Sequence, residues 1–180
     1  MKKELYKKIE IPEGTDAEIE GSLLRIKGSE GENSRRFILG PLKMTKEGNK
    51  ISIGIKNATK REKKMMNTIA AHIRNMIKGV QKKFEYELKA VFSHFPITLE
   101  VNGREVLIKN FLGEKNPRKT VIPKNVEIDI NGNLIKIKSI DRELAGQAAA
   151  KLETATRIRA RDRRIFQDGI FMTKKAGKEI

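Results

Sequence analysis

The residues best suited to chemistry lie in one short stretch near the end of the sequence. Five arginines fall within the eight positions of 157–164, and Asp162 is the only acid among them. Phe166 and Phe171 follow, with a turn-forming Gln-Asp-Gly sequence at 167–169 between them. Arginine carries a flat, permanent positive charge that fits phosphate oxygens, and aromatic rings can stack on exposed bases. The pattern predicts an RNA-docking tail, and a charged end that only faces water is the alternative.

The charge balance of the whole chain points in the same direction. The 180 residues include 39 Lys and Arg against 23 Asp and Glu, which gives a net charge of +16 and a pI near 10.1. Such a charge attracts polyanions, of which nucleic acid is the usual partner and an anionic membrane surface the competitor. The length of 180 residues allows one medium domain or two small ones, and the hydrophobic fraction of 38% is enough to build a core.

Catalytic and metal-binding patterns are not found in the sequence. Cysteine is absent, which excludes disulfides and thiol chemistry and fits a cytoplasmic protein. His72 and His94 lie too far apart to suggest a zinc site, and no acid is placed to orient His94 beside Ser93. Asp162 and Asp168 lie in basic sequence and are interpreted as charge partners. We therefore expect no catalytic residue, no metal, no cofactor and no small-molecule substrate. No apolar run approaches the ~20 residues that cross a bilayer.

An internal repeat organises the elements that must position the basic stretch. Four pairs of landmark residues are separated by 82 or 84 positions: Pro12 and Pro96, Gly21 and Gly103, Gly31 and Gly113, Asn49 and Asn133. The repeat predicts a first unit at residues 1–82 and a second unit at residues 83–180.

Each repeat contains strand-like sequence around glycine turns. Polar and apolar residues alternate through 16–27 and again through 98–109, and the second stretch contains the hairpin signal Asn102-Gly103. The alternating stretches at 51–55 and 134–138 follow further glycine turns. Alternation of this kind predicts antiparallel strands with one buried face.

One helix is expected at the end of each repeat. Thr59 and Glu62 have the spacing of a capping box, an apolar stripe at helical spacing follows, and Gly79 suits the end of the helix. Asp141 is predicted to begin the matching helix of the second repeat. The predicted fold class is α+β, a tandem duplication of a small antiparallel sheet plus one helix, with a basic C-terminal tail.

Two long loops are expected, at 28–41 and at 110–123. The second contains Lys115, Arg118 and Lys119. A basic loop on a rigid scaffold would give a second RNA contact, and a solvated hairpin loop is the alternative.

Several motifs resemble one known family, the large ribosomal subunit protein six family (universal class), over essentially the whole chain. They are IPEG at 11–14, FSHFP at 92–96, NFLGEKNPRKTVIP at 110–123 and RIRARDRRIFQDGIFMTKK at 157–175. The second and third resemble the archaeal or eukaryotic form. The bacterial form ends in a Gly/Lys-rich tail, whereas this chain has Phe-Gln-Asp-Gly-Ile at 166–170.

The resemblance implies a structural, non-catalytic protein of the cytoplasmic large ribosomal subunit. Such proteins bind large-subunit (23S-type) rRNA near the sarcin–ricin loop and the base of the factor-recruiting stalk, mainly through the second unit and its tail. Neighbouring ribosomal proteins are partners, and translation GTPase factors lie nearby. The expected rRNA-binding positions are Arg157, Arg159, Arg161, Arg163, Arg164, Gln167, Gly169, Lys174 and Lys175, together with Lys115, Arg118 and Lys119.

Other classes of protein remain as alternatives. A basic protein could bind RNA outside the ribosome, or lie on a membrane surface through the predicted helix at 60–78, which lacks the bulky aromatics of an inserting helix. A metal-dependent nucleic-acid enzyme would need clustered acids, whereas the acids here are scattered among lysines. Because the first unit begins with several acids, we expect it to face solvent and translation factors rather than RNA.

Overall fold

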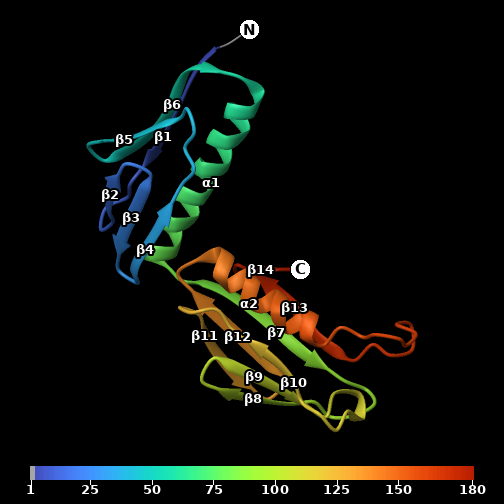
Figure 1. Ribbon diagram of the computed structural model, residues 1–180. Helices are drawn as coiled ribbons and strands as arrows, with labels where there is room; N and C mark the ends of the chain where they lie inside the picture. Colours follow the sequence, from blue (N-terminus) through green and yellow to red (C-terminus); the bar gives the residue numbers. More distant parts are fainter. Residues whose placement is uncertain (1–2) are drawn as a thin grey trace. The chain divides into compact units, whose positions relative to one another are not determined.

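The chain folds as two compact units, Met1–Lys83 and Phe84–Ile180, in a computed structural model that describes residues 3–180 (Figure 1). The sequence predicted a boundary one residue earlier, between 82 and 83. All strand pairings in the described chain are antiparallel. The predicted duplicated α+β fold is therefore confirmed.

Unit 1 contains two three-stranded sheets and one helix. The sheets have the strand orders β1-β6-β5 and β2-β3-β4. In chain order the elements are β1 (Lys3–Glu10), β2 (Asp16–Glu20), β3 (Leu23–Gly28), β4 (Gly31–Arg36), β5 (Lys43–Glu47), β6 (Lys50–Ala58) and α1 (Lys60–Gln81).

Unit 2 repeats this plan and extends it. Its sheets have the orders β10-β9-β8 and β11-β12-β7-β13-β14. The elements are β7 (Phe84–Val91), β8 (Thr98–Asn102), β9 (Glu105–Lys109), the 3-10 turn η1 (Phe111–Gly113), β10 (Arg118–Val121), β11 (Glu127–Asn131), β12 (Leu134–Ser139), α2 (Arg142–Ala155), β13 (Gly169–Lys175) and β14 (Lys178–Glu179).

The two units correspond element by element. In both units a first strand is followed by a sheet made of the next three strands, then by a hairpin and a helix. The pairings β1-β6-β5 and β7-β12-β11 also match. Each unit holds two sheets, rather than the single sheet that the sequence predicted. Within residues 3–180, the additional strands β13 and β14 belong to unit 2 and follow β7 in its larger sheet.

The predicted glycine turns are present in both units. Four hairpins close with two-residue loops whose first residue is glycine, and the φ angles of these glycines lie between +58° and +61°. A left-handed first loop residue is the pattern of a type II′ turn, which matches the twist of the flanking strands. The glycines are Gly21, Gly48, Gly103 and Gly132.

The two segments that the sequence predicted as long loops contain the last strand in sequence of the sheets β2-β3-β4 and β10-β9-β8, namely β4 and β10. In unit 1, β4 pairs with β3 through a tight turn at Gly28 and Gly31. In unit 2, β10 pairs with β9, and Arg118 lies opposite Ile108. Alternation gave no strand signal here because these strands are almost entirely polar, and Pro117 directly precedes β10.

Both helices begin where the sequence predicted. The Thr59 side chain accepts the Arg61 N–H, and the Glu62 carboxylate accepts the Thr59 backbone N–H at 2.8 Å, which completes the capping box. Asp141 accepts the Glu143 N–H at the start of α2. The expected end at Gly79 was wrong, because this glycine is buried inside α1 and the helix continues to Gln81.

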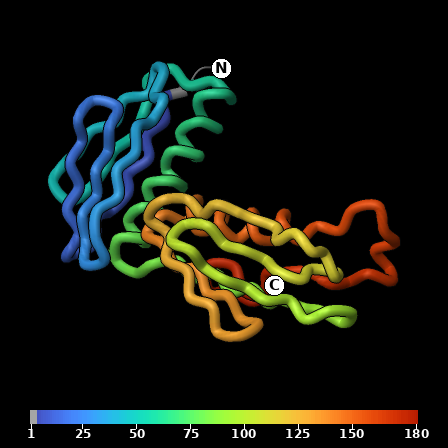
Figure 2. Tube along the Cα trace, turned by 60° about the horizontal axis from the view of Figure 1, so that its bottom comes forward, coloured from blue at the N-terminus to red at the C-terminus, as the bar shows by residue number. Residues whose placement is uncertain are grey.

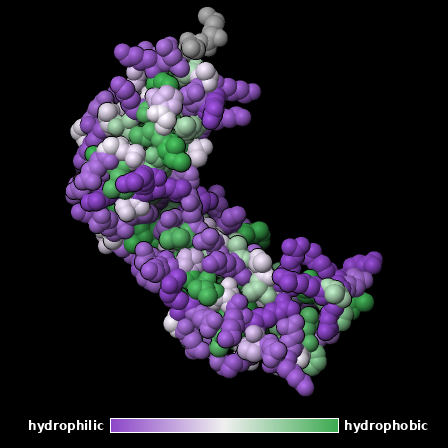
Figure 3. Space-filling model, viewed as in Figure 1, coloured by the Kyte–Doolittle hydropathy of each residue, from purple (hydrophilic) through white to green (hydrophobic). Residues whose placement is uncertain are grey.

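The core of unit 2 forms the rigid support for the candidate site. The α2 side chains Ala145, Ala148 and Leu152 are fully buried, as are Leu88 of β7 and Ile135 of β12. Small residues on the buried face of α2 let the helix lie close to the sheet. Among residues 3–180, neither helix is long and apolar enough to span a bilayer. Hydrophilic residues cover most of the face shown in Figure 3.

Candidate nucleic-acid interface

The predicted RNA-docking tail consists of two structurally different parts. Residues 157–168, here called the arginine segment, run irregularly from the end of α2 to β13 (Figure 2). The following residues form β13, which pairs with β7 along Gly169–Lys174 and is therefore part of the larger sheet. Ile170 is 1% exposed within the core. The tail is thus a segment that is held at both ends by packed structure.

The arginine segment exposes all five of its arginines to solvent. Within residues 3–180, the side chains of Arg157, Arg159 and Arg163 have no hydrogen bond or ion pair to another residue. Arg164 pairs with Asp162 at 3.1 Å, and its hydrogen bonds lower the pKa of the Asp162 carboxyl. Most of the segment's positive charge is therefore available to a ligand.

One aromatic side chain fixes the middle of the segment to unit 2. The ring of Phe166 stacks on His94 with centroids 4.9 Å apart, and the Arg161 guanidinium lies 4.8 Å from the centre of the same ring. Stacked rings and cation–π contacts each contribute about 0.5–1.5 kcal/mol. Phe166 is thus engaged with protein.

A buried carboxylate anchors the end of the segment. Asp168 is 2% exposed and accepts hydrogen bonds from the backbone N–H groups of Ser93 and His94, each at 3.2 Å. It also accepts the Ser93 hydroxyl and contacts His94 Nδ1, each at 2.9 Å. Burial raises the pKa of Asp168, but the bonds from His94 and Ser93 outweigh it and lower the pKa to about 2.

This cluster corrects the interpretation that no acid orients His94. Asp168 is that acid, from 74 positions further along the chain. The cluster is nevertheless not a catalytic relay, because Ser93 Oγ and His94 Nδ1 both contact the same oxygen of Asp168. A relay would need the serine on the other nitrogen of the imidazole. The cluster joins the FSHFP motif to the arginine segment instead.

Arg118 anchors the start of the arginine segment. Its guanidinium donates to both oxygens of Glu114, at 2.8 and 2.6 Å, and to the carbonyls of Ala155 and Arg157, at 2.9 and 3.2 Å. It also lies 4.3 Å from the ring centre of Phe111. The bonds from Arg118 lower the pKa of Glu114. Arg118 therefore joins the loop before β10 to the end of α2, and most of its donors are used within the protein.

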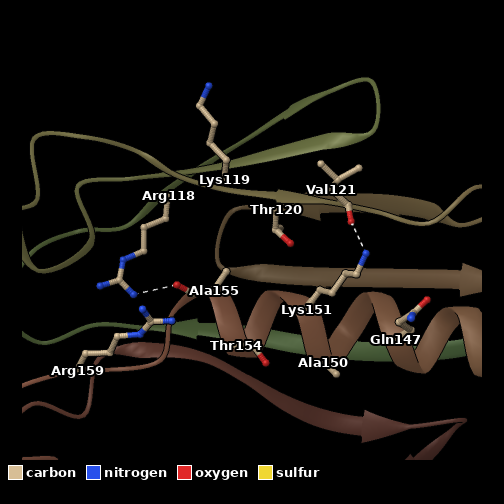
Figure 4. A pocket seen from close by; sticks show the side chains of 10 residues that line it. All are labelled: Arg118, Lys119, Thr120, Val121, Gln147, Ala150, Lys151, Thr154, Ala155 and Arg159. Atoms are coloured by element: carbon tan, nitrogen blue, oxygen red, sulfur yellow. Dashed lines mark hydrogen bonds between the residues drawn. The ribbon is translucent and has the colours of Figure 1, made fainter.

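A basic hollow lies between β10 and α2 (Figure 4). It has a volume of about 830 Å³, and its wall includes Lys119, Lys151 and Arg159 but no carboxylate. The Lys151 ammonium donates to the Val121 carbonyl at 3.0 Å. Figure 4 shows Lys119 pointing away from the helix, while the Arg118 and Arg159 side chains lie at one end of the hollow.

The remaining predicted positions differ in their surroundings. Lys115 and Lys175 are exposed, as is Lys119. Lys174 is half-buried and pairs with Glu87 at 3.1 Å. Gly169 is buried opposite Val91, and Gln167 donates to the Arg164 carbonyl at 3.1 Å. The sequence missed Lys151 as a member of the basic surface, since only the fold places α2 beside β10.

Among residues 3–180, no group of three or more His, Asp or Glu side chains could hold an ion. The interface presents exposed cations beside the packed core of unit 2. The structure has the features of a basic nucleic-acid-binding protein built from two α+β repeats.

Comparison with known proteins identifies the family. The family model for ribosomal protein L6 matches residues 11–83 and 95–169, which is one match in each unit. The large ribosomal subunit protein uL6 of Methanothrix thermoacetophila is 42% identical over 97% of this chain and 99% of its own length. Its counterparts from Sulfurisphaera tokodaii and Methanobrevibacter smithii are 42% and 41% identical, over 95% of this chain and 92% and 96% of their own lengths. The chain belongs to the ribosomal protein L6 family, which consists of structural proteins and not enzymes.

Proposed function

We propose that this protein is a structural component of the large ribosomal subunit in the cytoplasm. In this proposal, unit 2 and the arginine segment bind large-subunit rRNA near the sarcin–ricin loop and the base of the factor-recruiting stalk. Neighbouring ribosomal proteins complete the environment, and translation GTPase factors pass nearby. The family and its archaeal relatives support the ribosomal role, and the surface of unit 2 supports the choice of RNA-binding face.

The observation that carries the proposal is the anchoring of the arginine segment. Arg118 holds its start, Phe166 holds its middle, and Asp168 holds its end. Five exposed arginines are thereby presented without a long flexible linker. Fixing a charged loop in advance lowers the entropy that binding must remove, so a larger part of each phosphate contact contributes to affinity.

Phosphate contacts are expected to supply most of the binding free energy. Each neutralised phosphate releases counterions, so the logarithm of affinity falls with the logarithm of salt with a slope of about −0.7 to −0.9 per contact. The side chains at Lys119, Lys151 and Arg159 extend the positive surface beside the arginine segment. The rRNA is thus recognised mainly by the shape and position of its backbone.

The membrane-surface alternative is disfavoured by the packing of α1. The apolar residues that would enter a bilayer, including Met66, Ile69, Ile73 and Ile77, are buried in the core of unit 1. A surface-bound helix needs its apolar face free. Anionic liposomes are nevertheless a useful competitor in the binding experiment.

The test compares two five-residue variants of the full chain in a salt series with large-subunit rRNA. In the first, the five arginines at 157–164 become Gln; in the second, five exposed α1 cations become Gln: Lys60, Arg61, Lys63, Lys64 and Lys78. Both variants lose the same charge. We expect the magnitude of the salt slope to fall by about 3–5 in the first variant and by less than about 1 in the second.

Equal losses in the two variants would show that net charge alone drives binding, and would overturn the assignment of the RNA-binding face. Wild-type protein that bound anionic liposomes as tightly as rRNA would overturn the ribosomal proposal itself.

A further inference from the structure

A second hollow lies where the arginine segment enters β13, and its composition differs from that of the basic hollow beside β10. Its volume is about 640 Å³, within the range of roughly 300–1,000 Å³ of small-molecule sites. Its wall combines the rings of Phe166 and Phe171 with the cations of Arg157 and Arg163. A concave site that is both aromatic and positive calls for a ligand with both a planar and an anionic part.

The two phenylalanines of this hollow are not equivalent. Phe166 is half-buried and already stacked on His94. Phe171 is 48% exposed, although it lies on a strand whose neighbour Ile170 is buried. Its ring lies over Gly169, where an added Cβ would sit 3.2 Å from the ring tip. An aromatic ring left open beside a hollow is available to a ligand.

The charges around the hollow are arranged to leave the arginines free. Arg157 and Arg163 are exposed and have no side-chain partner among residues 3–180. The two carboxylates on the wall already have donors: Glu153 accepts the Met172 N–H at 2.9 Å, and Asp168 accepts Ser93 and His94. Both carboxylates are thus engaged by protein donors, and Arg157 and Arg163 are the charged side chains of the wall that remain free to pair with an anion.

We propose that this hollow binds one unpaired nucleotide of the RNA, with its base stacked on Phe171 and its phosphate held by Arg157 and Arg163. A sugar–phosphate backbone alone would make no use of the exposed ring, and an uncharged ring would make no use of the two arginines. An unstacked nucleotide carries both groups, and single-stranded bases are commonly bound on aromatic side chains. The inference rests on the proposed RNA-binding function and adds a base contact to it.

The test uses the full chain and large-subunit rRNA, with Phe171→Leu and Phe171→Tyr as a matched pair. Leucine keeps the apolar bulk but cannot stack, whereas tyrosine can. We expect Phe171→Leu to lower affinity about 5- to 150-fold, which corresponds to the roughly 1–3 kcal/mol of one base–aromatic stack. Its salt slope should stay unchanged, because no phosphate contact is lost. Phe171→Tyr should bind within about threefold of the wild type.

Chemical probing of the rRNA supplies an independent readout. One unpaired nucleotide should be protected by the wild type and by Phe171→Tyr but become reactive with Phe171→Leu. The double variant Arg157→Gln/Arg163→Gln should instead lower both the affinity and the salt slope. Thermal unfolding of Phe171→Leu close to that of the wild type would confirm that the fold is intact.

The outcomes separate the two proposals. Wild-type affinity and an unchanged footprint for Phe171→Leu would overturn the nucleotide site while leaving RNA binding in place. Failure of the wild type itself to bind large-subunit rRNA would overturn the proposed function.

Discussion

Units 1 and 2 share the same order of strands, hairpins and helix, yet they differ at one sheet edge. In unit 1, β1 is the outer strand of the sheet β1-β6-β5. In unit 2 the corresponding strand β7 pairs on both sides, with β12 and with β13. The added strand brings the chain back from the arginine segment into the core. The arginine segment of the candidate interface therefore lies in what was added to the repeat, whereas Arg118 and the basic hollow lie on elements that recur in both units.

A second difference concerns the segment before β4 in unit 1 and the corresponding segment before β10 in unit 2. In unit 1, β3 and β4 are joined by a tight turn. In unit 2 the corresponding segment contains left-handed residues at Asn110, Leu112 and Gly113, and Arg118 follows it. This longer connection supplies Glu114 and Phe111, which hold Arg118. In unit 2, the strained backbone of this connection thus supports a contact that positions the arginine segment.

Among the changes that should affect the two units differently, Arg118→Ala is expected to have the largest effect on stability. The change leaves the Ala155 and Arg157 carbonyls without their donor and Glu114 without its partner. We expect a loss of about 3 kcal/mol in the free energy of unfolding of unit 2, the upper end for lost hydrogen bonds to a charged group. Hydrogen exchange should rise around 110–118 and 155–159 and stay unchanged in α1. Lys119→Ala, at an exposed neighbouring position, is the control and should change stability by less than about 0.5 kcal/mol.

A loss of protection in α1 as large as that in unit 2 would contradict the assignment of the Arg118 contacts to unit 2 alone. Unchanged stability in Arg118→Ala would show that this residue is free to contact RNA, as the sequence predicted.

A smaller effect is expected from Asp168→Asn. The folded pKa of about 2 lies below the ordinary value of 3.8, so the carboxylate's contribution to stability is full above about pH 4 and is lost as the pH falls toward 2. The variant should lower the unfolding free energy of unit 2 by about 2 kcal/mol at neutral pH. It should also remove this part of the acid dependence, which urea unfolding at several pH values would measure.

Asp162→Asn is the matched control, because this carboxylate is exposed and contacts only its neighbour Arg164. Equal effects of the two variants at every pH would refute the anchoring role of Asp168.

The smallest effect on RNA binding is expected from a change that destabilises unit 1 alone. In Gly28→Ala the new Cβ would lie 2.7 Å from the Val80 carbonyl oxygen, a contact that the backbone must relieve by shifting. Overpacking of this kind costs about 1–3 kcal/mol. We expect a lower melting temperature for unit 1 by calorimetry and rRNA affinity within about twofold of the wild type, since no phosphate contact changes. A tenfold loss of affinity would place unit 1 in the RNA interface.

The elements with strong local signals could be predicted from the sequence. The glycine turns at Gly21 and Gly103 and the helix starts at Thr59 and Asp141 were correct because each depends on residues within a few positions of one another. The polar strands β4 and β10 were missed because their stability comes from pairing with β3 and β9, and their own composition carries little strand signal.

The sequence predicted the arginines of the candidate site but not the contacts that hold them in place. The arginines were found because charge density is visible in the sequence. The anchors were not: Asp168 meets Ser93 and His94 across more than 70 positions, and Arg118 meets Ala155 and Arg157 across more than 30. Contacts of such long range follow from the fold of unit 2, which no local pattern encodes. For the same reason Arg118 resembled an exposed cation of a basic loop.

Crosslinking of native large ribosomal subunits, with the crosslinked peptides and nucleotides read by mass spectrometry, tests most directly whether unit 2 is the RNA-binding unit. The account predicts crosslinks from residues 157–175 to one defined rRNA region, and few from residues 3–80. Dense crosslinks from unit 1, with few from the arginine segment, would contradict it.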